Sequence, residues 1–192
     1  PTENTRKEQH LVWYTHAVDH TQKPLRKQTI ELTPQKTSMQ FYDNAPETEI
    51  WSYGTWVALR IIRATVWDEL TFKVKNNLPQ DTTVHRHGVR VPFDQDGVPW
   101  FTQDPIQPWE EYTYTYTVWD PGTYWFHTHV NTSEQIARWL YGLLIVEEET
   151  PRWEYDQERV WALKDYRLNE DGTMNMNFDN MMDRTMAGRL GN

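Results

Sequence analysis

Residues 111–122 read EYTYTYTVWDPG, and this stretch decides the fold class of the chain. Tyr112, Tyr114 and Tyr116 alternate with threonines until an Asp-Pro-Gly turn ends the run. Successive side chains of a strand point to opposite faces, so the tyrosines share one face and the threonines the other. Residues 69–79, ELTFKVKNNLP, repeat this alternation and end in a turn-like Asn-Asn-Leu-Pro. Both stretches therefore predict strands that bury one face.

Short β-rich runs recur along the rest of the chain. They lie at residues 49–53, 58–65, 82–89, 123–130, 143–147 and 159–168. The central helical candidate is a turn or two over residues 133–138, which Ser133 could cap. Short strands at this spacing, separated by turn residues, predict an all-β sandwich or barrel.

The composition narrows the range of partners. The 192 residues include 19 Lys and Arg against 28 Asp and Glu, a net charge of −9. A net-acidic chain binds polyanions poorly, which argues against nucleic acid and anionic membrane surfaces as partners. No apolar run approaches the about 18 residues of a membrane span, and no signal peptide is recognisable. Cysteine is absent, so disulfides and thiolate ligands are excluded.

The pattern suggests three segments. Residues 1–37 are expected to be an N-terminal extension, because their first 28 positions are polar and weakly patterned. Residues 38–150 hold most of the predicted strands and form the expected domain. An acidic stretch with Pro151 then leads into residues 151–192, whose one predicted strand cannot make a domain alone. That segment is expected to be a linker and the truncated start of a second domain.

Two His-X-His pairs dominate the chemistry. His85 and His87 flank one arginine, and His127 and His129 flank one threonine, each pair within a predicted strand. Residues i and i+2 of a strand share a face, about 6.6 Å apart along the chain. Neighbouring strands would therefore bring four imidazoles to one patch. Such a set suits copper above the other metals that favour imidazole, whereas structural zinc fits poorly without thiolate or nearby carboxylate.

Plainer interpretations stand beside this one. A His-X-His in a strand is also typical of an exposed polar face. His16 and His20 are four residues apart and could chelate on a helix, but their surroundings read as a polar extension. Methionines 174, 176, 181, 182 and 186 could bind Cu(I), or belong to a loop without an ordered role.

Two stretches resemble the multicopper oxidase family. TTVHRHGVRVPFDQDGVPWFTQDPI (residues 82–106) is similar to the family's His-X-His-Gly segment followed by Asp-Gly-Val-Pro and Thr-Gln. DPGTYWFHTHVNTSEQIARWLYGLLIVEE (residues 120–148) is similar to its second His-X-His segment and closing strand. The resemblance implies the first cupredoxin domain, a Greek-key β-barrel, of an enzyme such as a laccase, bilirubin oxidase or copper-resistance oxidase. It also implies a periplasmic or secreted location.

The resemblance assigns roles to five residues. It implies that His85 binds the type 2 copper of a three-copper cluster and that His87, His127 and His129 bind the type 3 pair. Asp96 matches an acid that helps deliver protons to dioxygen, although an aspartate before Gly97 is also typical of a turn. Glu134 could support the site, or simply carry a helix-start charge.

Half of the family's copper machinery has no counterpart here. The family's blue copper needs a cysteine, and four further histidines of the cluster come from the same last domain. The chain would therefore need other cupredoxin domains, in its own polypeptide or another, to couple oxidation of phenols or metal ions to reduction of dioxygen to water. The alternatives are a non-catalytic copper-binding or storage module and a structural β-domain whose metal site has decayed.

Several positions depart from the family pattern. Trp67, Trp100, Trp109 and Trp139 stand where glycine is usual, and Arg86 stands where tryptophan is usual. Average usage of ~7% would give about 13 glycines, and the chain has 8. A tryptophan held at positive φ costs about 1–3 kcal/mol. Either these turns are rebuilt, or the tryptophans replace natural glycines in turns that keep their shape.

Overall fold

The computed structural model describes residues 26–55, 59–151, 153–178, 180–181 and 191. Their elements are β1 (Lys27–Leu32), β2 (Gln35–Met39), β3 (Thr48–Ser52), β4 (Arg60–Thr65), β5 (Glu69–Lys75), β6 (His85–His87), the 3-10 turn η1 (Phe93–Gln95), β7 (Glu111–Thr117), β8 (Gly122–His127), α1 (Thr132–Gln135) and β9 (Tyr141–Glu147). No helix within these ranges is long and apolar enough to cross a membrane.

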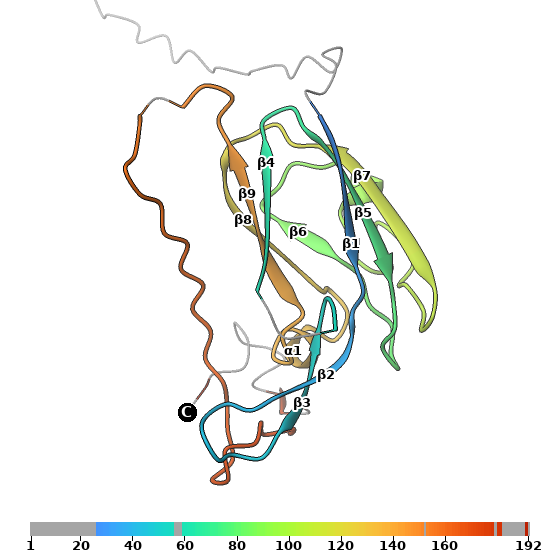
Figure 1. The fold of residues 1–192 in the computed structure, drawn as a ribbon. Coiled ribbons are helices and arrows are strands. Elements are labelled where there is room, and N and C mark those ends of the chain that lie inside the picture. The colour runs from blue at the N-terminus through green and yellow to red at the C-terminus, as the bar shows by residue number, and fades with distance from the viewer. Residues whose placement is uncertain (1–25, 56–58, 152, 179, 182–190, 192) are drawn as a thin grey trace, which may run out of the picture.

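Two sheets face each other across the core (Figure 1). One has three strands in the order β1-β5-β7, and the other has four in the order β4-β9-β8-β6. β1 runs parallel to β5 and β4 parallel to β9, while β5–β7, β6–β8 and β8–β9 are antiparallel. A small β2-β3 sheet lies at the lower end in Figure 1. The all-β prediction is confirmed.

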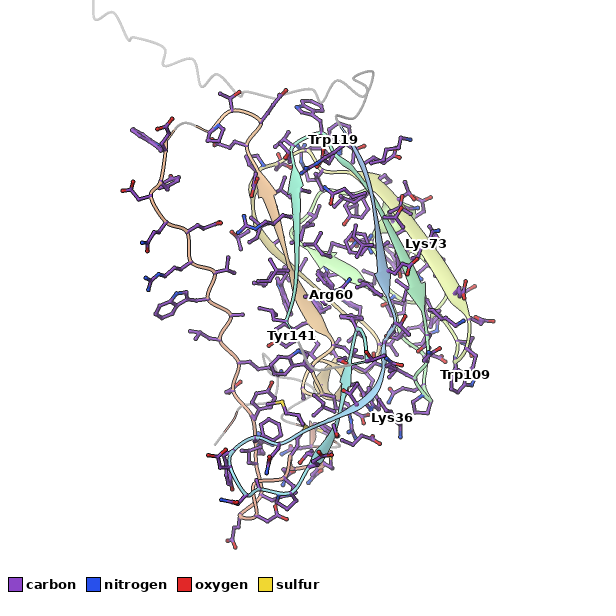
Figure 2. The ribbon with its side chains drawn as sticks, in the orientation of Figure 1. Lys36, Arg60, Lys73, Trp109, Trp119 and Tyr141 are labelled. Carbon is purple, nitrogen blue, oxygen red and sulfur yellow. The ribbon has the colours of Figure 1, made fainter. Side chains whose placement is uncertain are left out.

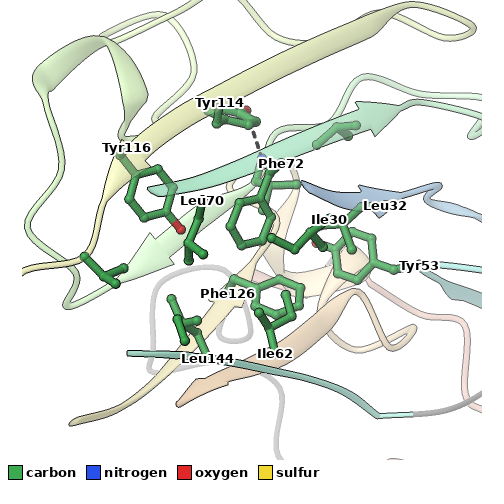
Figure 3. Close-up of a cluster of buried hydrophobic side chains, with 14 of the residues drawn as sticks. Ile30, Leu32, Tyr53, Ile62, Leu70, Phe72, Tyr114, Tyr116, Phe126 and Leu144 are labelled. Atoms are coloured by element: carbon green, nitrogen blue, oxygen red, sulfur yellow. Dashed lines mark hydrogen bonds between the residues drawn. The ribbon is translucent and has the colours of Figure 1, made fainter. Parts of the chain in front are cut away.

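The alternating residues build the core, as predicted. Leu70 and Phe72 of β5 and Tyr114 of β7 are all fully buried. They meet Phe126 of β8 and Leu144 of β9 between the sheets (Figure 3). The rings of Phe72 and Phe126 are 5.9 Å apart and edge to face, so the two sheets interlock through aromatic contacts.

The N-terminal boundary lies earlier than predicted. β1 pairs with β5 along its whole length, and it buries Ile30 and Leu32 in the core. The expected extension over residues 1–37 is therefore wrong for residues 27–37, which include β1 and the start of β2. The sequence did not indicate β1, because only two of its six residues are buried and most of the others are polar. Residues 1–25 lie outside the described part.

The strand predicted over residues 159–168 does not form. The segment is extended in Figure 1, but apart from one bridge between Leu168 and Met174 it pairs with no described strand. Trp161 and Leu163 are 76% and 89% exposed, whereas Tyr166 packs against Trp139. A strand needs a hydrogen-bonding neighbour, and no strand described here lies beside this segment. Its apolar pattern alone could not reveal that.

The four tryptophans at family glycine positions all keep a left-handed backbone. Their φ angles are 77° at Trp67, 60° at Trp100, 72° at Trp109 and 102° at Trp139. The interpretation that these turns are rebuilt is therefore wrong. Contacts of two of these side chains partly offset the cost of the left-handed backbone, because Trp67 packs against Trp119 and Trp139 packs against Tyr166. Trp100 and Trp109 are 74% and 71% exposed and gain little.

Candidate metal centre

The pairing of β6 with β8 brings the two His-X-His segments together. His85 lies opposite His127, and His87 lies opposite Trp125. Arg86 and Phe126 form the intervening pair, and both are buried in the opposite direction, toward the core. The period-two prediction that His85, His87 and His127 share a face of adjacent strands is confirmed. His129 follows two residues after β8 ends.

His85 lies at the middle of the four imidazoles. Its ring centroid is 5.6 Å from that of His87, 5.4 Å from that of His127 and 5.3 Å from that of His129. The ligand atoms of His85, His87 and His127 all lie within 4.8 Å of one another, close enough to hold a metal ion. We call these three residues together with His129 the histidine centre.

Hydrogen bonds leave one nitrogen of His127 without a partner. Its Nδ1 lies 2.8 Å from the carbonyl oxygen of Thr128, which identifies Nδ1 as the protonated nitrogen. Its Nε2 is buried and has no hydrogen-bond partner in the part of the chain that the structure describes. Burial lowers the pKa of His127 to about 4, so the ring is neutral at pH 7. A buried orphan nitrogen is costly, and a metal ion would satisfy it.

His85 is held in a similar way by the loop that follows β6. Its Nδ1 lies 2.8 Å from the backbone oxygen of Asp96 and 3.2 Å from the Asp96 carboxylate. Burial lowers the pKa of His85, although Asp96 opposes the shift. These bonds direct Nε2 away from the loop, as second partners of ligating histidines commonly do.

Gly97 makes that approach possible. Its φ is +79°, and a Cβ there would lie 2.1 Å from the carbonyl oxygen of Val84. Only glycine fits this contact. The turn at Gly97 lets the loop approach β6, and it thereby places the preceding residue, Asp96, beside His85. The turn interpretation of Asp96 is confirmed, and its part in proton delivery stays a prediction.

A buried polar network beneath the second histidine pair was missed by sequence reasoning. Gln135 is fully buried, and its Oε1 accepts hydrogen bonds from Thr128 and from Thr82 (2.8 Å). Its Nε2 donates to the backbone oxygen of Asp81 at 2.8 Å. Gln135 thereby fixes the residue between His127 and His129 to the segment before His85. A threonine between two histidines was the available signal.

The other candidates lie elsewhere. Glu134 sits in the first turn of α1, where it pairs with Arg138 at 2.8 Å, so the helix-start interpretation describes it better. Asn131, not Ser133, is the N-cap residue of α1. Met174 is buried against Ile50 and Phe178. Met176 and Met181 are exposed. His10, His16, His20, Met182 and Met186 lie outside the described residues.

Arg86 is a cation buried behind the histidine centre. It is 1% exposed, and its Cζ lies 4.2 Å from the ring centroid of Tyr114 and 4.9 Å from that of Tyr116. Its Nη1 donates to the Val84 carbonyl, but its Nε and Nη2 have no partner of good hydrogen-bond geometry among the described residues. The guanidinium lies near the Tyr116 hydroxyl and opposes the rise that burial causes in the pKa of Tyr116. Phe72 lies at 6.0 Å as a third ring, and the cost of burying a cation with two unsatisfied donors is expected to exceed what these three cation–π contacts contribute.

Arg86→Met is therefore expected to raise the free energy of unfolding by about 1–3 kcal/mol, the usual cost of a buried unsatisfied donor. Urea unfolding measures the change. Arg138→Met is the matched control, because Arg138 is 9% exposed but is paired with Glu134 and Glu49. The control should lose stability. A loss in Arg86→Met as well would contradict the assignment of Arg86 as a net cost.

Comparison with known proteins is consistent with this geometry. The family model described as multicopper oxidase matches residues 34–151. Copper resistance protein A of Escherichia coli is 38% identical over 107 residues, which cover 55% of this chain and 17% of that protein. Multicopper oxidase MmcO of Mycobacterium tuberculosis is 37% identical over 141 residues, which cover 73% of this chain and 27% of that protein.

A solved structure has the same fold over most of the chain. The multi-copper oxidase from Pseudomonas thermotolerans superposes with a TM-score of 0.76 and 31% identity, over 86% of this chain and 40% of that one. The predicted cupredoxin-like fold is confirmed by this likeness. The chain spans 17% to 40% of the length of these three relatives.

Proposed function

The chain belongs to the multicopper oxidase family, and from this membership we propose that its histidine centre is its share of an oxygen-reducing copper cluster. The observation that carries the proposal is the buried Nε2 of His127, which has no hydrogen-bond partner among the described residues. The ligand atoms of His85 and His87 lie within 4.8 Å of a ligand atom of His127. Neutral imidazoles without thiolate match the ligand preference of copper.

We assign the type 2 copper to His85 and the type 3 pair to His87, His127 and His129. Bound copper would supply one-electron redox chemistry and a binding place for dioxygen. The protein's own part is to hold the rings. Thr128 and Asp96 keep Nδ1 of His127 and of His85 occupied, so that Nε2 of each remains available.

Asp96 is the candidate proton carrier. Its carboxylate lies 3.2 Å from Nδ1 of His85, and its side chain is 33% exposed. It therefore contacts both solvent and the histidine centre, which a group that moves protons from water to dioxygen requires.

The remaining ligands would come from further cupredoxin domains, in the same polypeptide or in another. The relatives are much longer than the matched region, and the chain has no cysteine for a blue copper site. The complete enzyme would oxidise phenols or metal ions in the periplasm or outside the cell. A non-catalytic copper-binding module is the second candidate, favoured by the same lack of cysteine.

Copper titration tests the site itself. His127→Ala and His87→Ala are each expected to weaken copper(II) binding by at least ~100-fold, beyond the 10–100-fold typical of lost supporting groups. Competition with a chelator of known affinity measures the change. His16→Ala is the control and should bind like the wild type. Unchanged affinity in both ligand variants would refute the copper site.

A further inference from the structure

Trp125 belongs to the same face as the histidine centre. It lies in β8 two residues before His127, so both side chains leave the strand on one side. Across the ladder its partner residue is His87 of β6. The indole therefore has a candidate ligand beside it along the strand and another beside it across the sheet.

The indole is stacked on His127 and tilted against His87. The indole centroid lies 3.9 Å from the His127 centroid with 27° between the planes. It lies 5.3 Å from the His87 centroid with 33° between the planes. Trp125 is half-buried, so its ring forms a wall that covers one side of both imidazoles.

This wall matters most for His87. A hydrogen bond to a backbone carbonyl oxygen holds Nδ1 of His85 and Nδ1 of His127, at Asp96 and Thr128 respectively. His87 is exposed, and no hydrogen bond to a described residue holds its ring. Its orientation rests on ring contacts, with Trp125 at 5.3 Å, His85 at 5.6 Å and His127 at 5.7 Å. The indole is the only one of these three that is not itself a candidate ligand.

We propose that Trp125 is a positioning residue of the metal centre, which holds His87 and His127 in ligating orientation and stabilises their metal-bound form. An imidazole that gives its lone pair to a metal ion gains positive character. The face of an indole attracts positive charge more strongly than any other side-chain ring. The stack should therefore be tighter with copper bound. This inference rests on the proposed copper site.

Copper affinity and the copper(II) EPR spectrum of the 192-residue chain test the role. Trp125→Leu removes the ring face but stays apolar, and it is expected to weaken copper(II) binding by roughly 3- to 30-fold, the usual value of such contacts. The nitrogen coupling in the EPR spectrum should change with it. Trp125→Phe, which restores a ring face, should recover most of the affinity and the wild-type spectrum.

Three comparisons make the outcome decisive. Trp153→Leu is the matched control, because Trp153 is 70% exposed and does not belong to the centre. Trp125→Met takes the place of Trp125→Leu if the leucine variant fails to fold. Wild-type affinity and spectrum in a folded aliphatic variant would overturn the role of Trp125. If His127→Ala also left the affinity unchanged, the copper site itself would fail instead.

Discussion

Replacing Trp100 and Trp109 together with glycine is expected to raise the free energy of unfolding by up to about 5 kcal/mol. Each tryptophan sits at a positive φ, 60° and 72°, which costs about 1–3 kcal/mol for a residue other than glycine. Each glycine lowers this gain by about 0.4–1 kcal/mol, because it increases the conformational freedom of the unfolded chain. A net gain near the upper end of this range is large beside the roughly 5–15 kcal/mol that stabilises a typical domain.

These two positions are chosen because their turns are fixed and their side chains are exposed. Trp100 donates its backbone N–H to Gln103 at 2.8 Å, and Trp109 donates to Asn76 at 2.7 Å. The backbone therefore cannot relax without losing a bond. Figure 2 shows Trp109 at the rim of the barrel, so glycine there gives up little buried surface. Trp139 differs, because it packs with Ile50 and Tyr166.

Thermal and urea unfolding would measure the gain, which should raise the melting temperature by roughly 2–4 °C per kcal/mol in a chain of this size. Trp161→Gly is the matched control. Trp161 is 76% exposed, and it is not among the described residues with positive φ. It should not gain stability. A double glycine variant no more stable than the wild type would show that the left-handed turns carry no strain.

The copper-loaded chain is expected to consume no oxygen with phenolic donors and to show no intense blue absorption. Blue copper sites require a cysteine thiolate, and the sequence contains none. Without a blue copper, electrons from the donor have no entry site. The four histidines offer half of the ligands that the family's three-copper cluster uses, so the acceptor of those electrons is incomplete. The same reasoning predicts less copper per chain than the three ions of a full cluster.

An oxygen electrode, together with metal analysis of the purified chain, measures both quantities. The control is His129→Ala, which should behave like the wild type in oxygen uptake because neither turns over. Sustained oxygen uptake by the wild-type chain that His129→Ala abolishes would contradict the proposal. It would mean that the chain assembles a complete oxidase by itself.

Local pattern was a reliable guide wherever burial follows the alternation of one strand. Leu70, Phe72 and Tyr114 point inward as their spacing predicts, and the same rule placed His85 and His87 on one face. The rule was wrong for residues 159–168, which have a strand-like pattern but no neighbouring strand among the described elements. Pairing is a property of two segments, and one segment's sequence contains only half of it.

By itself, the sequence determined the fold class, the shared face of each histidine pair and the lack of a thiolate, because each depends on residue type and on period two alone. Only the tertiary structure decided which strands are neighbours. That choice set His85 opposite His127, buried Nε2 of His127 without a partner among the described residues, and placed Trp125 against His127 and His87. It also carried Asp96 to His85 across a loop and placed Gln135 under Thr128. These contacts join residues from distant segments, and packing of the whole chain selects them.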